Sequence, residues 1–253
     1  MNDQTVLAFG CHPDDIEFTC AGTLALLHKA GWQVHLATLA GGECGSVELG
    51  REAIREIRLK ECAASAAVLD GEFTWAGGED LELEFSAELR ARTVDVIRKV
   101  RPDVVITQPP ADYMIDHEET SKLVRHACFG APMPNVPSPK HKKPIAGVPA
   151  LYYTDAMDSV DIYGRPVPIA FTIDITSVID IKTEMLACHA SQRDWLRAHH
   201  GVDEYLDLMR RQSAARGEKA GVEYAEAFTQ HLGHGYPHAN LIAEALKEYV
   251  ISP

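Results

Sequence analysis

Residues 5–27 read TVLAFGCHPDDIEFTCAGTLALL, and this stretch decides the fold class. It begins with an apolar run, 5–11, that is typical of a buried strand. The run ends in an imidazole, a proline and two adjacent carboxylates (12–15), and a helical pattern follows over 21–30. Neighbouring carboxylates at the end of a buried strand are costly unless a positive charge lies close to them. The stretch therefore predicts a strand, a charged site and a helix in succession.

The remainder of the first half repeats this alternation of strand and helix. Further strands are predicted at 33–40 and 103–110, and helices at 52–69, 88–102 and 118–128. Short connections between alternating strands and helices indicate a mostly parallel sheet with helices on both faces. The sequence thus predicts an α/β protein of three layers.

One domain is expected over residues 1–253. Its parts are a core with the charged site (1–128), a proline-rich loop (129–149) and C-terminal strands and helices (150–253). A loop this long is typically a lid or an interface segment. The C-terminal part is predicted to contain strands at 150–157 and 169–176, then helices at about 177–199 and 203–216.

The composition excludes several classes of function. A formal net charge of −13 disfavours binding to nucleic acid or to an anionic membrane, because both need a basic surface. The apolar runs are shorter than the roughly 20 residues that cross a bilayer. The first ten residues lack the basic start of a secretory signal. The six cysteines are scattered singly, which favours free thiols and a cytoplasmic location.

Polar clusters follow three of the predicted strands, at 12–15, 41–43 and 112–117. The carboxyl ends of parallel strands meet at one edge of a sheet, where ligands gather. His12, Asp15 and His117 would together supply two imidazoles and a carboxylate, a set that suits one catalytic zinc ion with a position open for water. The competing interpretation is a polar loop beside a helix that Asp116 caps.

Asp14 lies between two of these ligands and would point away from the metal. Zinc lowers the pKa of a bound water from about 15.7 to about 7. A carboxylate within hydrogen-bond reach can take the proton as water attacks a carbonyl. Asp14 is therefore the expected general base.

At these residues the chain resembles the LmbE-like, or PIG-L, deacetylases, which are zinc-dependent and act on N-acetylglucosamine-type conjugates. The resemblance runs over nearly the whole length, in the motifs HPDDIEFTCAGTLALL (12–27), GGECGS (41–46), IRLKECAASAAVL (57–69), DHEETSKLV (116–124), EMLACHASQ (184–192) and RGEKAGVEYAEAF (216–228). It implies a Rossmann-like fold, zinc at His12, Asp15 and His117, Asp14 as general base and, as is common in relatives, a homo-oligomer.

The resemblance implies further site residues. Arg58 and Asp80 are similar to residues that contact substrate in relatives, and His189 is similar to one that steadies the oxyanion or the leaving group. From the residues alone, Arg58 fits equally well as an exposed helix arginine paired with Glu61. His189 fits equally well as a polar residue on a buried helix face.

The chain departs from the family pattern at Met114, where many relatives carry a catalytic histidine. The group that protonates the leaving amine is therefore open, with Asp14, His189 and Asp112 as candidates. Asp112 would otherwise contact substrate or orient a metal ligand by a hydrogen bond. Met114 would shape the pocket as an adaptable apolar wall.

These observations predict a metal-dependent amide hydrolase, an N-deacetylase whose substrate is a small N-acetylated amino sugar conjugate. One alternative is a Rossmann-like relative that binds metal and has lost activity. Another is an amidase that acts on a small molecule without a sugar. The presence of Asp14 beside a three-ligand set favours catalysis, because structural zinc sites are usually closed by four protein ligands.

Overall fold

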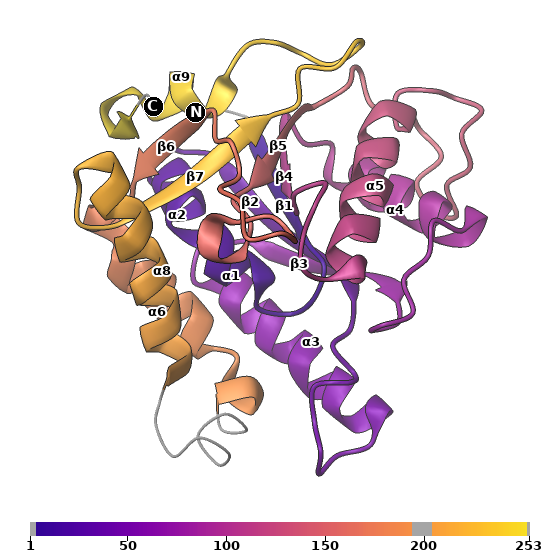
Figure 1. Cartoon of the computed structure of the whole chain (residues 1–253). Coiled ribbons are helices and arrows are strands. Elements are labelled where there is room, and N and C mark those ends of the chain that lie inside the picture. The colour runs from indigo at the N-terminus through magenta and orange to yellow at the C-terminus, as the bar shows by residue number, and fades with distance from the viewer. Residues whose placement is uncertain (1–3, 194–203, 252–253) are drawn as a thin grey trace.

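The strand that opens the chain, β1 (Thr5–Gly10), lies inside an eight-stranded sheet with the order β3-β2-β1-β4-β5-β7-β6-β8. The structure is a computed structural model that describes residues 4–193 and 204–251 (Figure 1). β1 pairs in parallel with β2 (Gln33–Ala40) and β4 (Val104–Thr107). β3 (Glu72–Gly78) and β5 (Ala150–Thr154) extend the parallel part on either side.

Three antiparallel strands complete the sheet beyond β5. They are β7 (Ala225–Gln230), β6 (Phe171–Asp174) and β8 (Val250–Ile251). They lie in the C-terminal part, where the sequence predicts an elaboration of the core, and β6 falls on the strand predicted at 169–176. β3, β7 and β8 were not predicted.

Helices cover both faces of the sheet (Figure 1). One layer holds α4 (Ala87–Val100) and α5 (Ile115–Gly130). The other layer contains α1 (Asp15–Thr19), α2 (Ala21–Lys29), α3 (Arg51–Ala67), α6 (Ile179–Ala187), α8 (Glu204–Ala220) and α9 (Leu241–Ala245). The three-layer, mostly parallel α/β fold is therefore confirmed.

The pattern of β1 explains why the sheet has two cores. Val6 and Ala8 are buried in one cluster, whereas Leu7 and Phe9 are buried in the other. Successive side chains of a strand point to opposite faces, so a continuous apolar run fills both cores. None of the described helices has the length and apolar character needed to cross a bilayer.

The proline-rich segment packs along α4. Arg98 donates hydrogen bonds to the carbonyls of Ala131 and Met133, and Asp95 accepts from the backbone of Lys140 and His141. The predicted helix at 177–199 corresponds to α6, and the part of that prediction from 194 onward lies outside the described residues.

Candidate metal centre

The parallel pairing of β1 with β4 brings the two halves of the site together. His12 and Asp15 follow the carboxyl end of β1, and His117 lies in the first turn of α5, after β4. Asp15 Oδ2 lies 3.7 Å from His12 Nδ1 and 3.5 Å from His117 Nε2. Two histidines 105 positions apart in sequence therefore direct imidazole nitrogens at one carboxylate oxygen.

The other nitrogen of each imidazole is held by carboxylates. His12 Nε2 lies 3.1 Å from Asp80 Oδ1 and 3.3 Å from Asp116 Oδ2, and His117 Nδ1 lies 2.9 Å from Asp112 Oδ1. A proton held on these nitrogens leaves the lone pairs of His12 Nδ1 and His117 Nε2 facing Asp15.

The unpartnered nitrogen of His117 tests whether this donor set fits a metal. His117 Nε2 is buried and has no hydrogen-bond partner among the described residues. Buried polar atoms without a partner are rare, and a bound cation would satisfy this one. Two imidazoles and a carboxylate are ligands that zinc accepts, so the residues fit the implied ion.

Asp15 is positioned by the turn in which it lies. Its Oδ2 accepts hydrogen bonds from the backbone amides of Cys11 and His12 and from the side-chain amide of Gln108. These three donors fix the carboxylate between the imidazoles. Gln108 follows β4 directly, and its place at the end of a predicted strand is the signal that could have identified it.

Two other candidate ligand groups adjoin this set. Cys11 lies close enough to join His12, Asp15 and His117, but burial raises the pKa of its thiol to about 12, and the thiolate is the form that binds metal. His12, Asp80 and Asp116 form a second compact group. An ion there would leave His117 Nε2 without a partner, so the first set is the better candidate.

Acidic groups around the two imidazoles raise the pKa of both. Burial lowers the pKa of His117, but Asp15 and Asp112 raise it overall. Burial likewise lowers the pKa of His12, and contacts with Cys11, Asp116 and Asp80 raise it well above its ordinary value. Because a metal must displace these protons, its binding is linked to pH.

Asp14 is held in a strained conformation beside the candidate ligands. Its φ of +94° lies in the left-handed region, which costs a non-glycine residue about 1–3 kcal/mol. Its Oδ2 accepts hydrogen bonds from the hydroxyl of Tyr205 at 2.6 Å and from Arg58 at 3.3 Å. Burial raises the pKa of the carboxyl, whereas Arg58 and His189 oppose that shift.

Arg58 is a buried residue of α3 and not an exposed one. It donates hydrogen bonds to the carbonyls of Pro13 and Gly42 as well as to Asp14. A Cβ on Gly42 would lie 2.6 Å from Arg58 Nη1, which explains the glycine at this turn. The structure does not pair Arg58 with Glu61, whose carboxylate instead accepts from Ser191.

His189 is fully buried behind Asp14. Its Nε2 lies 3.0 Å from Glu17 Oε1, and Ser65 donates to the same oxygen at 2.5 Å. Burial lowers the pKa of His189, but Glu17 and Asp14 raise it overall. A direct role for His189 in catalysis stays a prediction.

A cavity of about 170 Å³ opens beside the candidate ligands. Its described lining residues are Asp14, Asp15, Phe18, Thr19, Gln108, Asp112, Tyr113, His117, Asp155 and Met157. Asp112 thus reaches the cavity, whereas Arg58, Asp80 and Met114 do not line it. Tyr113 and Met157 provide the apolar wall that the sequence assigns to Met114. The substrate-binding roles of Arg58, Asp80 and Asp112 stay predictions.

The chain is similar in sequence to known deacetylases and to a hydratase. The family model for GlcNAc-PI de-N-acetylase (PIG-L) matches residues 7–128. Diacetylchitobiose deacetylase of Thermococcus kodakarensis is 30% identical over 195 residues, which cover 75% of this chain and 70% of that protein. A 4-oxalmesaconate hydratase of Pseudomonas putida is 26% identical, covering 75% and 74%.

A solved structure supports the same fold. N,N′-diacetylchitobiose deacetylase from Pyrococcus horikoshii superposes with a TM-score of 0.75 at 24% identity, covering 95% of this chain and 89% of that chain.

Proposed function

This chain belongs to the PIG-L (LmbE-like) family, and from that premise we propose that it is a zinc-dependent hydrolase that removes an acetyl group from an N-acetylglucosamine-type amide. Its deacetylase relatives support a hydrolytic enzyme. The observation that carries the proposal is the convergence of His12 Nδ1, Asp15 Oδ2 and His117 Nε2 beside a buried carboxylate.

The proposed mechanism divides the work among these residues. His12, Asp15 and His117 would hold the ion, which when bound supplies a Lewis acid that acidifies water and polarises the amide carbonyl. Arg58 and Tyr205 both contact Oδ2 of Asp14, so Oδ1 is the oxygen placed to exchange a proton. Asp14 would take a proton as water attacks the carbonyl carbon. It would then return that proton to the amine nitrogen as the carbon–nitrogen bond breaks and acetate leaves.

The charge balance of the cavity accommodates a neutral amide. Four carboxylates line it, and the described lining includes no lysine or arginine. Arg58 contacts Asp14 and Arg216 contacts Asp155, and a bound zinc ion would offset the charge of Asp15. Hydration of an unsaturated carboxylic acid, which the name of the Pseudomonas relative suggests, is the second candidate.

Release of primary amine from a panel of N-acetylated sugars tests the proposal. We expect amine release by the zinc-loaded protein, its loss with a chelator and its return when zinc is restored. Water addition to 4-oxalmesaconate without amine release would instead favour the hydratase.

The ligand assignment is tested by metal content. His117→Ala should lose most of its zinc, whereas His126→Ala, further along α5 and outside the site, should keep it. Elemental analysis that finds equal zinc in the two variants contradicts the assignment.

A further inference from the structure

A surface pocket of about 480 Å³ lies beside α5, separate from the metal-site cavity. Its described lining residues are Phe85, Lys122, Arg125, His126, Phe129, His231 and Tyr236. None of them lines the metal-site cavity. The volume falls within the range of about 300–1,000 Å³ that is usual for small-molecule sites. The pocket is therefore large enough for a ligand, and the proposed function does not use it.

Three segments that are distant in sequence form this pocket. α5 contributes four lining residues at positions i, i+3, i+4 and i+7, which lie on one face of a helix. Phe85 precedes α4, and the loop after β7 contributes His231 and Tyr236. The pocket therefore exists only in the folded chain.

The loop after β7 is held firmly against α5. The hydroxyl of Tyr236 donates to the carbonyl of Arg125 at 2.6 Å, and the ring centroids of His231 and Tyr236 lie 4.2 Å apart. A Cβ on Gly235 would lie 2.8 Å from Phe129 Cε2, so the glycine lets the loop pack closely against this ring. Two walls of the pocket are thus ordered before a ligand arrives, which lowers the entropic cost of binding.

The ionisable side chains of the pocket are cationic or neutral. No carboxylate is among its described lining residues. Lys122 Nζ is paired with Glu119 Oε1 at 2.6 Å. Arg125, in contrast, forms no ion pair with any carboxylate in the described part of the chain. The guanidinium of Arg125 is therefore the charge that an entering ligand would meet.

The pKa values of two nearby imidazoles indicate the same positive potential. Burial and Arg125 lower the pKa of His231, and burial and Arg90 lower that of His126. Arg90 itself lies over the ring of Phe85, 5.0 Å from its centroid. This part of the surface therefore attracts anions, although the whole chain has a formal net charge of −13.

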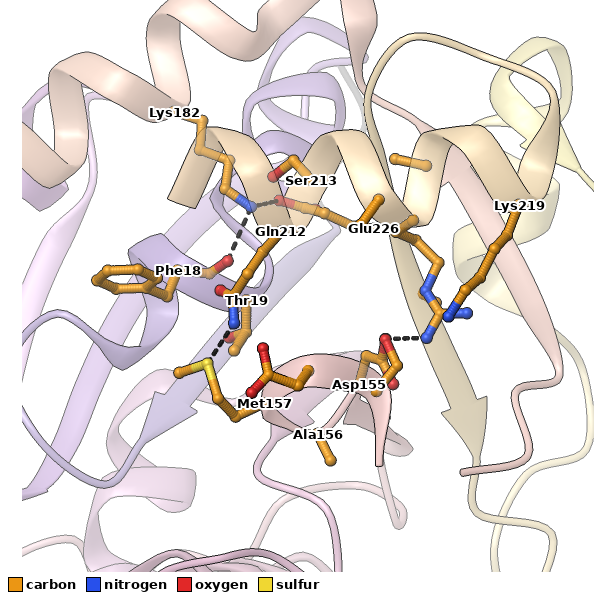
Figure 2. Close-up of a pocket in the computed structure, with 16 residues that line it drawn as sticks. Phe18, Thr19, Asp155, Ala156, Met157, Lys182, Gln212, Ser213, Lys219 and Glu226 are labelled. Carbon is orange, nitrogen blue, oxygen red and sulfur yellow. Dashed lines mark hydrogen bonds and ion pairs between the residues drawn. The ribbon is translucent and has the colours of Figure 1, made fainter. Parts of the chain in front are cut away.

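A cavity of about 150 Å³ beside α8 contains cations in a different state (Figure 2). There Lys182 Nζ lies 2.7 Å from Glu226 Oε1, and Arg216 forms an ion pair with Asp155. An anion would have to compete with a carboxylate for either of these cations. At Arg125 an anion meets no such competition among the described residues.

Aromatic rings form much of the remaining lining. Phe85 and Phe129 are 42% and 41% exposed, and the ring centroids of Phe129 and Tyr236 lie 6.0 Å apart. The imidazole of His126 meets the ring of Phe85 edge-on at 5.4 Å. Such rings can stack on a further aromatic ring. An aromatic ligand would cover this apolar surface, whereas an inorganic anion would leave it in water.

We propose that this pocket binds a small anionic molecule that carries an aromatic ring. Its anionic group would accept hydrogen bonds from the guanidinium of Arg125, and its ring would lie against Phe85 and Phe129. A neutral aromatic molecule would lack the charge-assisted hydrogen bond, and a cationic one would be repelled by the guanidinium. The inference does not rest on the proposed function, because the pocket is separate from the metal site.

Titration calorimetry of the whole chain with 1-naphthoate tests this site. A chelator in the buffer removes any contribution from binding to a metal. We expect saturable binding to one site per chain. The Kd should be at least about tenfold lower than that of 1-naphthamide, which has the ring without the charge, or of acetate, which has the charge without the ring.

Substitutions in the pocket identify where the probe binds. Arg125→Gln should weaken binding about tenfold or more, because it removes a hydrogen bond to a charged group. Arg125→Lys keeps the charge and should lose less. Phe129→Ala should weaken binding about threefold through the lost ring contact. Arg211→Gln, at an exposed position of α8 outside the lining, changes the net charge equally and should bind as the wild type does.

Several outcomes would overturn the inference. Absence of naphthoate binding, or equal Kd values in Arg125→Gln and Arg211→Gln, would show that the pocket does not bind this class of ligand. Naphthamide that binds as tightly as naphthoate would assign the pocket to neutral ligands, and acetate that does so would assign it to anions without a ring. Sedimentation velocity in which the wild type associates and Phe129→Ala does not would assign the pocket to a contact between copies of the chain.

Discussion

Removing the Asp112 carboxylate tests whether His117 is a metal ligand whose imidazole is oriented by a hydrogen bond to Asp112. Asp112 Oδ1 lies 2.9 Å from His117 Nδ1, and both side chains are buried. A hydrogen bond to a charged group contributes about 1.5–3 kcal/mol. Its loss in Asp112→Ala should therefore weaken zinc binding about ten- to a hundredfold. Asp112→Asn keeps an oxygen acceptor and should lose less.

The effect of Asp112→Ala should become smaller as pH falls. Burial lowers the pKa of His117, but Asp15 and Asp112 raise it overall, so at low pH zinc must displace a proton from wild-type His117. Without Asp112 the imidazole holds that proton less tightly. The weaker competition offsets part of the lost affinity below the wild-type pKa, whereas above it the full loss remains.

Zinc titration against a competing chelator, at about pH 6 and about pH 8, measures both effects. Asp207→Ala, an exposed aspartate of α8, is the matched control and should bind zinc as the wild type does. Wild-type affinity in Asp112→Ala at the higher pH would refute the reasoning, because His117 would then not depend on this hydrogen bond.

Three further predictions concern the base, the fold and pH. Asp14→Asn should keep its zinc but lower kcat about a hundredfold or more, and near wild-type turnover would remove Asp14 from the role of base. Glu226→Ala leaves the buried ammonium of Lys182 unpaired, which should cost about 3–5 kcal/mol and lower Tm by about 6–20 °C. The exposed Glu244→Ala is the control by calorimetry, and equal Tm values would contradict this estimate. Wild-type zinc affinity should fall as pH decreases, because the raised pKa values of His12 and His117 keep both imidazoles protonated without metal. An affinity independent of pH would argue against both ligands.

The parallel half of the fold was predictable because its strands are continuous apolar runs. The side chains of β1 and β2 are buried on both faces of the sheet, so both strands stand out in the sequence as continuous apolar runs. β3 is a partly exposed edge strand, and β7 contains alanine and glutamate, which are depleted in strands. Both segments become strands because they pair with neighbouring strands, and not because their own residues favour the strand conformation.

The convergence of His12, Asp15 and His117 could be predicted because it depends on topology and residue type, whereas their role as metal ligands stays a prediction. The contact of Tyr205 with Asp14 and the place of Asp155 in the cavity lining could not be predicted, since α8 and β5 reach the site only through the packing of the whole chain. The burial of Arg58 could not be predicted either, because its place in the helix pattern fits an exposed position as well as a buried one.

The left-handed backbone of Asp14 restricts which residues position 14 tolerates. Glycine, asparagine and aspartate adopt this conformation readily, whereas β-branched residues do not. In a saturation mutagenesis library, folded but inactive proteins should therefore be concentrated in glycine and asparagine. Valine, isoleucine and threonine should reduce the yield of folded protein as well. Comparing the two groups therefore separates the need for a left-handed backbone at position 14 from the need for a carboxylate there.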